Sequence, residues 1–227
     1  MSISLIIFGL NEIDGITHLS KRINKQKKHL KEIIYIDGGS KDGSIEKAKK
    51  NGWKVFIQNT RNKGVLNGIK YGLRKAKGSH IIFFSPDNNC IPEKISIIKK
   101  KINQGYDFVK VSRYLNNAKS YDDTLITSFG NWMFTFMVQI LYGSKCTDVL
   151  GIYYGIKLSL FKNLKIDLNN PALNTEVVIK TNANNVKHID IPGDELSRIG
   201  GESSRSIIYN GLIELYTIFK FLFIKLK

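Results

Sequence analysis

Polar residues that could bind a nucleotide or a metal ion follow three short apolar runs of the sequence. The first set is Asn11 and Glu12, the second spans residues 37–44 (Asp-Gly-Gly-Ser-Lys-Asp-Gly-Ser), and the third spans residues 85–89 (Ser-Pro-Asp-Asn-Asn). Carboxylates there can accept hydrogen bonds from a base or a ribose, and a carboxylate beside an asparagine suits a hard divalent cation. Each set taken alone is more typical of an ordinary turn.

These sets need a scaffold that brings them together, and the first half of the chain has the pattern of one. Short apolar runs alternate there with polar, helical segments. We expect strands at residues 3–10, 32–36, 53–58, 80–84 and 107–112, and helices at residues 16–30, 43–51, 64–77 and 92–103. This alternation predicts an α/β fold with a mostly parallel, doubly wound sheet flanked by helices. Such a sheet binds its ligand at the carboxyl ends of the strands, where the three polar sets begin.

The second half of the chain is less regular. We expect a long apolar helix, a strand, a second helix and a second strand, followed by a basic loop and a final helix. The expected ranges are 124–141, 148–156, 174–183 and 187–191. The predicted organisation is one domain over residues 1–206 and a C-terminal apolar helix over residues 207–227.

Length and composition are those of one globular domain. The chain has 227 residues, of which 42% are hydrophobic and 24% charged, and this excludes wholesale disorder and fibrous repeats. Two cysteines make no disulfide framework, and the four histidines lack metal-ligand spacing, so no zinc site is predicted. Free cysteines and an N-terminus without a charged leader predict a cytoplasmic location.

The net charge of +16 is concentrated in one half of the chain. Residues 1–115 hold 23 Lys and Arg against 9 Asp and Glu, which gives +14. A basic chain favours anionic partners such as acidic lipids or phosphorylated substrates. The alternative is an ordinary solvated lysine surface. No nucleic-acid-binding motif accompanies the charge, so nucleic acid is not an expected partner.

The C-terminal segment, residues 207–227, is the candidate for membrane contact. A glutamate and lysines interrupt its apolar residues, whereas a spanning helix needs about 20 mostly apolar residues. Two interpretations stay open: a helix in the bilayer interface, giving a peripheral membrane protein, or a helix packed on the domain or on a second copy in a homodimer. On a helical wheel one apolar stripe forms, while Ile218, Phe221 and Ile224 fall on other faces. The stripe consists of Ile208, Leu212, Leu215, Tyr216, Phe219, Leu222, Phe223 and Leu226.

The polar motifs follow one another in a characteristic order. They are residues 10–13 (Leu-Asn-Glu-Ile), 37–44, 61–64 (Arg-Asn-Lys-Gly), 76–78 (Ala-Lys-Gly), 85–89, 111–114 (Val-Ser-Arg-Tyr) and 147–151 (Thr-Asp-Val-Leu-Gly). In this order the chain resembles the family 2 nucleotide-sugar glycosyltransferases with the GT-A fold, in particular the polyprenyl-phosphate glycosyltransferases of the dolichol-phosphate mannose synthase type. The resemblance covers essentially the whole chain. It implies an inverting transfer of a sugar from a UDP- or GDP-linked donor.

The resemblance also implies which residues bind the donor. Asp87 matches the second acid of the family's Asp-x-Asp motif and is the expected catalytic ligand of Mg²⁺ or Mn²⁺, together with Asn89. Ser85 replaces the first acid of that motif, and Gly38 replaces an aspartate beside Asp37. A metal would then be held by one carboxylate, by neutral oxygens and by the donor diphosphate. The expected ligands of the nucleotide sugar are Asn11, Glu12, Asp37, Asn62, Gly64, Ser85 and Asp87.

The acceptor decides whether a catalytic base is needed. The resemblance implies a lipid phosphate, which is ionised near neutral pH and needs cations to position it. Arg113, Arg198 and Arg205 are the expected cations, although Arg113 could instead pair with a structural carboxylate. A sugar hydroxyl would need a carboxylate base, for which Asp148 and Glu176 are candidates that could equally cap a turn or a helix.

The sequence therefore favours a transferase that acts on a polyprenyl phosphate at the cytoplasmic face of the membrane. One alternative is a family 2 enzyme that acts on a saccharide hydroxyl in surface polysaccharide synthesis. Another is a non-catalytic, GT-A-like module that binds anions, which the missing first acid of the metal motif would suit.

Overall fold

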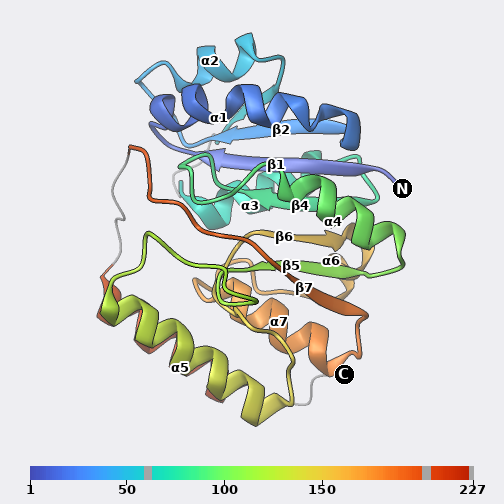
Figure 1. Ribbon diagram of the computed structural model, residues 1–227, viewed down its shortest axis with the longest axis vertical. Helices are drawn as coiled ribbons and strands as arrows, with labels where there is room; N and C mark the ends of the chain where they lie inside the picture. Colours follow the sequence, from blue (N-terminus) through green and yellow to red (C-terminus); the bar gives the residue numbers. More distant parts are fainter. Residues whose placement is uncertain (59–62, 201–205, 225–227) are drawn as a thin grey trace.

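A seven-stranded sheet with the order β3-β2-β1-β4-β6-β5-β7 forms the centre of the protein (Figure 1). The computed structural model describes residues 1–58, 63–200 and 206–224, so the predicted ligands Asn62 and Arg205 lie outside the described residues. The strands are β1 (Ile3–Gly9), β2 (Glu32–Asp37), β3 (Lys54–Ile57), β4 (His80–Phe84), β5 (Phe108–Ser112), β6 (Tyr154–Lys157) and β7 (His188–Pro192).

All neighbouring strands are parallel except β6, which runs antiparallel to both β4 and β5. The predicted mostly parallel sheet is thus confirmed. The predicted strand over residues 148–156 is wrong in its first half, because β6 begins only at Tyr154. The preceding residues form a turn in which the Asp148 carboxylate accepts a hydrogen bond from the backbone N–H of Gly151 at 3.0 Å.

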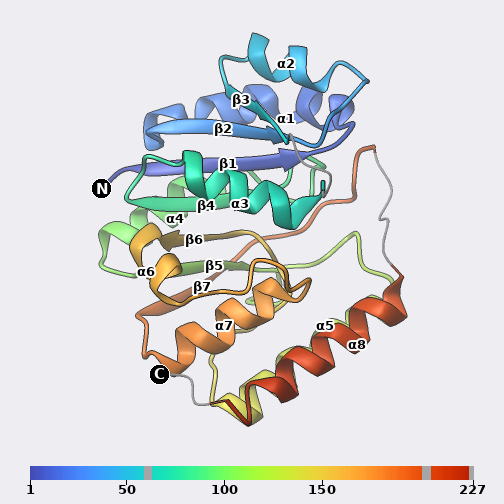
Figure 2. The same cartoon turned by 180° about the vertical axis from the view of Figure 1, so that it is seen from behind.

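Helices cover both faces of the sheet, as the continuous burial of the central strands requires. In β1, Leu5 and Ile7 pack towards α1, α2 and α4, whereas Ile6 and Phe8 pack towards α3, α6 and α7. The two views show these groups of helices on opposite faces (Figures 1 and 2). The helices are α1 (Ile13–Lys25), η1 (Lys27–His29), α2 (Ser44–Lys50), α3 (Val65–Lys75), α4 (Lys94–Asn103), α5 (Leu125–Tyr142), α6 (Leu158–Asn163), α7 (Leu173–Ala183) and α8 (Ile207–Lys220).

The strand order reverses at β1, and this reversal places the candidate site. The chain winds from β1 to β2 and β3 on one side, and then returns to pair β4 with the other side of β1. The connections after β1 and β4 lead to α1 and α4 on the same face, but from there towards β2 and β5 on opposite sides of the switch in strand order, where ligands of such sheets bind. Two of the three polar sets found in the sequence follow these two strands.

Helices α5 and α8 lie side by side beyond the β7 edge of the sheet, next to α7 (Figures 1 and 2). Helix α5 begins at a capping box between Thr124 and Thr127 and ends at Gly143, whose φ of 64° closes the helix. The Tyr142 hydroxyl donates a hydrogen bond to the carbonyl of Ile218 and so fixes the two helices together. No helix in the described part of the chain is long and apolar enough to cross a bilayer.

Helix α8 uses a different face for packing from the one that its sequence pattern suggests. Ile218 and Phe221, which fall outside the predicted stripe, are buried in the core shared with α5 and α7. Members of the stripe are exposed instead, with Leu212 at 61% and Phe223 at 88%. The helix is therefore both part of the core and the bearer of an apolar outer surface.

One partly buried carboxylate of α8 leads to a prediction on stability. Burial raises the pKa of Glu214 to about 7, against the opposing hydrogen bond of 2.6 Å from the Thr175 hydroxyl. Because the folded pKa lies above the ordinary value of 4.5, the folded state is penalised as pH rises from 4.5 towards 7 and carries the full penalty above 7. We expect Glu214→Gln to raise the free energy of unfolding by about 1–3 kcal/mol at pH 8 and to change it little at pH 5.

Urea denaturation at the two pH values measures this effect. Glu176→Gln is the control, because Glu176 is also a helix carboxylate and is fully buried, but it pairs with Lys180 at 2.7 Å. That variant should be less stable than the parent protein at pH 8. A Glu214→Gln protein that is no more stable at pH 8 than at pH 5, relative to the parent, would contradict the prediction.

Candidate active site

A cleft of about 700 Å³ opens at the carboxyl ends of β1, β4 and β5, the edge of the sheet where the sequence pattern predicts the ligand. The predicted residues that line it are Glu12, Gly64, Ser85, Asp87, Asn89, Arg113, Asp148 and Arg198. Asn11, Asp37 and Glu176 do not line the cleft.

Asp87 lies in the turn after β4, and this turn presses against the first turn of α1. Gly15 permits the contact, because a Cβ at this position would overlap the carbonyl oxygen of Pro86. Asp87 is buried, and its Oδ1 accepts a hydrogen bond from the backbone N–H of Asn89 at 3.2 Å. Its Oδ2 lies 3.0 Å from a guanidinium nitrogen of Arg198. The expected metal ligand and an expected phosphate ligand are thus in direct contact.

Residues 194–199, which we call the strap, hold Arg198 in this position. The strap is hydrogen-bonded on one side to the turn after β4 and on the other to the loop before α5, so it joins these two segments. The bonds to the β4 turn run from Asn88 Nδ2 to Ser197 O, from Asn89 Nδ2 to Leu196 O and from Ile199 N to Asp87 O, each 2.9 Å. Those to the loop before α5 include Tyr121 N to Glu195 O at 2.8 Å and Arg198 N to Asp122 Oδ1 at 3.2 Å.

Glu12 brings to the cleft a carboxylate with one oxygen that has no partner in the described part of the chain. Its backbone N–H donates a hydrogen bond to the Ser44 hydroxyl at 2.8 Å, which fixes the residue at the start of α1. The side-chain oxygen Oε2 is buried and has no hydrogen-bond partner among the described residues. Burial, reinforced by the negative charge of Asp87 and opposed by Arg198, raises the pKa of Glu12 to about 7. A buried carboxylate oxygen without a hydrogen-bond partner is costly unless a ligand binds to it.

Two predicted donor ligands build the turn after β2 rather than the cleft wall. Both carboxylate oxygens of Asp37 are used within this turn, accepting hydrogen bonds from the backbone N–H groups of Gly39 and Ser40 and from the Ser40 hydroxyl, each at 2.6 Å. Asn11 accepts a hydrogen bond from the backbone N–H of Lys41 at 3.0 Å. These residues shape the backbone that Gly38 presents to the cleft. Direct contact of Asp37 with a base stays a prediction.

A lysine in the cleft wall was missed by the sequence analysis. Lys63 lines the cleft beside Gly64, and its ammonium group lies over Gly39, where a Cβ would be only 2.6 Å from Nζ. The chain carries so many lysines that no local signal marks this one. Gly64, with a φ of 132°, is in a conformation that favours glycine, and its N–H donates to the Gln58 side chain at 3.2 Å. The basic group and the glycine turn suit a diphosphate.

Arg113 is not a free cation in this structure. Its guanidinium forms two hydrogen bonds with the Asp148 carboxylate, at 2.7 and 2.9 Å, and a third with Glu195 at 3.0 Å. Burial opposes the charges, but the ion pair outweighs it, lowering the pKa of Asp148 to about 2 and raising that of Arg113. In the structure Arg113 therefore pairs with carboxylates, which is the alternative role given for it above. Asp148, with so low a pKa, is a poor general base.

The Arg113–Asp148 pair leads to a second prediction on stability. Removing one partner leaves a buried charge uncompensated, so we expect Arg113→Ala and Asp148→Asn each to lower the free energy of unfolding by about 3–5 kcal/mol. Because the folded pKa of Asp148, about 2, lies below its ordinary 3.8, the contribution of the pair is complete above pH 3.8 and is lost as pH falls towards 2.

The matched control is Arg22, which makes the same two-bonded contact with Glu93 on the surface, at 2.7 and 3.0 Å. Arg22→Ala should cost at most about 1 kcal/mol, because exposed ion pairs contribute little. Urea denaturation at pH 7 measures all the variants. Equal losses for Arg22→Ala and Arg113→Ala would show that burial does not govern the pair at Arg113.

Glu176 is a structural residue, and the prediction of a catalytic role for it has no support in its position. Its side chain is buried in α7 and accepts hydrogen bonds from the backbone of Asp167 and the side chain of Asn170, both at 2.9 Å. The ammonium group of Lys180, one turn along the helix, donates a further hydrogen bond to Oε1 of Glu176 at 2.7 Å. These contacts tie the loop before α7 to the helix and use both carboxylate oxygens.

A second group of potential metal ligands lies away from the cleft. Cys146, His188 and Asp190 come together although the sequence gives them no metal-ligand spacing. The polar atoms of Asp190 are already occupied, by His188 at 2.6 Å and by the backbone and hydroxyl of Thr147 at 2.6 and 2.7 Å. Burial raises the pKa of the Cys146 thiol, which disfavours the thiolate that a metal would need. The contacts join the loop after α5 to β7.

The cleft, in contrast, offers oxygen atoms suited to a hard divalent cation. Asp87 and Glu12 provide carboxylates, Asn89 an amide oxygen and Ser85 a hydroxyl, and all four residues line the same space. Mg²⁺ and Mn²⁺ prefer oxygen ligands of these kinds. The Oε2 of Glu12, unpartnered among the described residues, is the observation that most directly indicates that these residues suit a cation.

The family model named glycosyl transferase family 2 matches residues 4–165, which include β1 to β6. Among curated proteins, the dolichol-phosphate mannosyltransferase of Pyrococcus furiosus is 30% identical over 123 residues, covering 52% of this chain and 35% of that protein. The undecaprenyl-phosphate 4-deoxy-4-formamido-L-arabinose transferase of Edwardsiella ictaluri is 26% identical over 218 residues, covering 91% and 63%. This chain thus spans between 35% and 63% of the length of these two relatives.

A solved structure is similar over nearly the whole chain. Glucosyl-3-phosphoglycerate synthase from Mycobacterium tuberculosis, in complex with Mn²⁺, uridine diphosphate and phosphoglyceric acid, matches with a TM-score of 0.71 and 16% identity. The match covers 99% of this chain and 79% of that one. At this identity the likeness concerns the fold, and it confirms the GT-A fold predicted from the sequence.

Proposed function

Because the chain belongs to glycosyl transferase family 2, we propose that it transfers a sugar, with inversion, from a UDP- or GDP-linked donor to a polyprenyl phosphate. The names of two relatives support this acceptor, since one acts on dolichol phosphate and the other on undecaprenyl phosphate. The observation in the structure that carries the proposal is the state of the two candidate bases. Asp148 is ion-paired to Arg113, and Glu176 lies outside the cleft.

An acceptor hydroxyl must lose its proton to a base during transfer, whereas an acceptor phosphate is already ionised. Asp148 pairs with Arg113, and Glu176 pairs with Lys180 outside the cleft, so neither is available as a base. This favours a phosphate as the acceptor. In the proposed step a phosphate oxygen attacks the anomeric carbon of the sugar and forms the new C–O bond. The bond from that carbon to the diphosphate breaks, and its electron pair leaves with the nucleoside diphosphate.

The donor would lie between the connections after β1 and β4. Gly38, Lys63 and Gly64 suit the diphosphate, because the lysine stabilises the charge of a leaving group and the two glycines carry no side chain to hinder its approach. Asp87 and Asn89 would hold Mg²⁺ or Mn²⁺, which would supply Lewis-acid stabilisation of the same charge. Mn²⁺ and uridine diphosphate occur together in the mycobacterial neighbour, which supports a divalent cation with a UDP-linked donor.

Arg198 is the described cation best placed for the acceptor phosphate. It reaches the cleft from the strap and already contacts a carboxylate there, at 3.0 Å. When a metal ion neutralises Asp87, the guanidinium would be released to bind another anion, and arginine matches phosphate oxygens well. Arg113 would position the cleft wall through Asp148 and Glu195 rather than bind phosphate.

The outer surface of α5 and α8 is the proposed site of membrane contact, and we call it the apolar face. It consists of Leu125, Ile126, Phe129, Trp132, Phe136 and Ile140 on α5, and of Ile208, Tyr209, Leu212, Tyr216 and Phe219 on α8, with Leu222 and Phe223 following; all are exposed. Phe129, Trp132 and Phe136 form a row, with ring centroids 5.7 and 5.5 Å apart. Aromatic and aliphatic side chains on such a surface are typical of helices in a bilayer interface.

The position of the apolar face suits an acceptor that comes from a membrane. Both helices begin at the edge of the molecule where β1 and β2 end, as Figure 1 shows for α5 and Figure 2 for α8. The loop that leads into α5 binds the strap through Asp122 and Arg198. A lipid phosphate in a bilayer under α5 and α8 would thus be near Arg198. This arrangement favours a peripheral protein at the cytoplasmic face of the membrane.

Turnover with defined acceptors tests the proposal. UDP- and GDP-linked sugars are incubated with undecaprenyl or dolichyl phosphate in detergent and Mg²⁺ or Mn²⁺, and sugar is measured in the organic phase. Transfer to the lipid phosphate and none to a saccharide is the expected result. Transfer to a saccharide alone would favour polysaccharide synthesis, and donor binding without any transfer would favour a non-catalytic module.

A further inference from the structure

We infer that Glu12 is a ligand of the divalent cation, and that it supplies the second carboxylate which Ser85 does not provide. The inference rests on the proposed function, because it concerns the cation of that same cleft. From its place in the sequence, Glu12 is expected to bind the nucleotide sugar. The structure gives it surroundings that suit a cation better than a hydrogen-bond donor of a sugar or a base.

The Glu12 side chain is held in the cleft by its neighbours in the chain. The absence of a side chain at Gly9 makes room for it, because a Cβ there would lie 2.7 Å from Cγ of Glu12. Ser44 fixes its backbone by a hydrogen bond of 2.8 Å. The carboxylate is thus placed at the end of β1 with one oxygen buried and unpartnered among the described residues.

Glu12 and Asp87 face the same volume from two connections of the sheet. Gly15 brings the first turn of α1 against the turn that carries Asp87, at Pro86. Both carboxylates line the same cleft. Two carboxylates close together in a poorly solvated site repel each other unless a cation lies between or beside them.

The described cation in this position is Arg198, and it compensates the pair incompletely. Its guanidinium contacts Asp87 at 3.0 Å but leaves Oε2 of Glu12 without a partner. A divalent cation would satisfy both carboxylates at once, together with the Asn89 amide oxygen and the Ser85 hydroxyl. Ser85, which follows β4 directly, is neutral and replaces the first acid of the Asp-x-Asp motif. The Glu12 carboxylate, which comes from the β1 side, would bring the number of acidic ligands back to two.

Binding of Mn²⁺ to the purified chain, measured by electron paramagnetic resonance of the free ion, tests the inference without turnover. We expect Glu12→Gln to weaken Mn²⁺ binding at least about tenfold, as the loss of one anionic ligand should. Ser85→Asp in the Glu12→Gln background should recover most of this loss, since the charge is returned from the other wall. The control is Asp14→Asn, which removes the same charge from an exposed position of the same helical turn and should leave binding unchanged.

Two further measurements separate the inference from its competitors. Binding of UDP or GDP in the presence of EDTA should be unchanged in Glu12→Gln, whereas a ligand of the ribose or base would lose affinity without metal. In thermal unfolding without metal, Glu12→Gln should unfold cooperatively with a midpoint temperature at least as high as that of the parent, because the substitution removes a poorly compensated charge. This would show that weaker Mn²⁺ binding does not reflect unfolding.

Each outcome is decisive. Mn²⁺ binding by Glu12→Gln that equals the parent's would overturn the inference while leaving the proposed function in place. So would a loss of nucleotide affinity in EDTA that accounts for the whole effect, or a double variant in which Ser85→Asp restores nothing. If the parent protein binds no Mn²⁺ even with UDP or GDP present, the metal-dependent function itself fails, and this inference with it.

Discussion

Asp87→Asn is expected to reduce sugar transfer about a thousandfold or more while the protein remains folded. The carboxylate is buried in the turn after β4 and lines the cleft with the other oxygen ligands. A metal ion that stabilises a leaving diphosphate contributes several kcal/mol to catalysis, and each 1.36 kcal/mol is a factor of about ten in rate. Initial rates with the donor and lipid phosphate, at saturating Mn²⁺, measure the loss.

Ser85→Ala is the matched control in the same turn. It removes a neutral oxygen and no charge, so we expect a loss of less than about tenfold. Circular dichroism should show the parent fold in both variants, because Asn has the shape of Asp and can still accept the bond from the backbone of Asn89. Transfer by Asp87→Asn at close to the parent rate would remove Asp87 from the active site.

Replacing three residues of the apolar face is expected to release the protein from lipid vesicles. Leu125, Leu212 and Phe223 are 92%, 61% and 88% exposed, so their replacement by Gln should leave the fold intact. Each apolar side chain of this size contributes about 1.5–3 kcal/mol when buried. Together the three changes should lower partitioning into vesicles more than about a thousandfold. Sedimentation with vesicles in high salt measures it.

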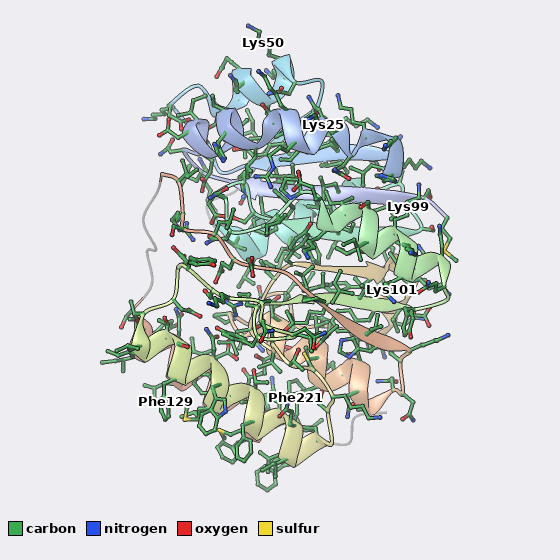
Figure 3. All side chains as sticks on the ribbon, in the orientation of Figure 1. Lys25, Lys50, Lys99, Lys101, Phe129 and Phe221 are labelled. Carbon is green, nitrogen blue, oxygen red and sulfur yellow. The ribbon has the colours of Figure 1, made fainter. Side chains whose placement is uncertain are left out.

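Truncation of α8 would be a poor test, because Ile218 and Phe221 belong to the core and their removal would expose it. The control for electrostatic attraction is the basic end of the molecule. Lys25 and Lys50 lie at one end of the molecule, and Phe129 of the apolar face lies at the other (Figure 3). Lys25→Gln and Lys50→Gln should affect binding only in low salt, since attraction between exposed charges fades beyond about 8 Å at physiological ionic strength.

If the parent protein does not bind vesicles and is instead dimeric in solution, the apolar face is covered by a second copy. The same three substitutions would then yield monomers, which analytical ultracentrifugation would detect. If vesicle binding of the triple variant persists in high salt, the proposed membrane surface is wrong.

Features that depend on neighbouring residues were predictable from the sequence. Apolar runs followed by polar turns predicted β1, β2 and β4 and the edge at which their ligands would meet, because a strand and the turn that ends it are set by local pattern. Ser85-Pro86-Asp87 follows β4, and the capping box at Thr124 begins α5, within a residue of expectation. The net charge of +14 on residues 1–115 is also evident from the sequence, but the sequence does not decide between an anionic partner and an ordinary solvated surface.

Features that depend on partners distant in the chain were decided only by the tertiary structure. Arg113 meets Asp148 and Glu195, which are 35 and 82 residues away, so no local pattern distinguishes a structural arginine from a phosphate ligand. Helix α8 has apolar residues on several faces, and only its contact with α5 and α7 decides that Ile218 is buried and Leu212 exposed. In the same way, Glu12 has the local pattern of a turn residue. Only the approach of α1 to the β4 turn, permitted by Gly15, brings its carboxylate into the cleft with Asp87 and leaves Oε2 without a partner among the described residues. Burial and pairing are properties of where chain segments meet, and a sequence specifies those meetings only through the whole fold.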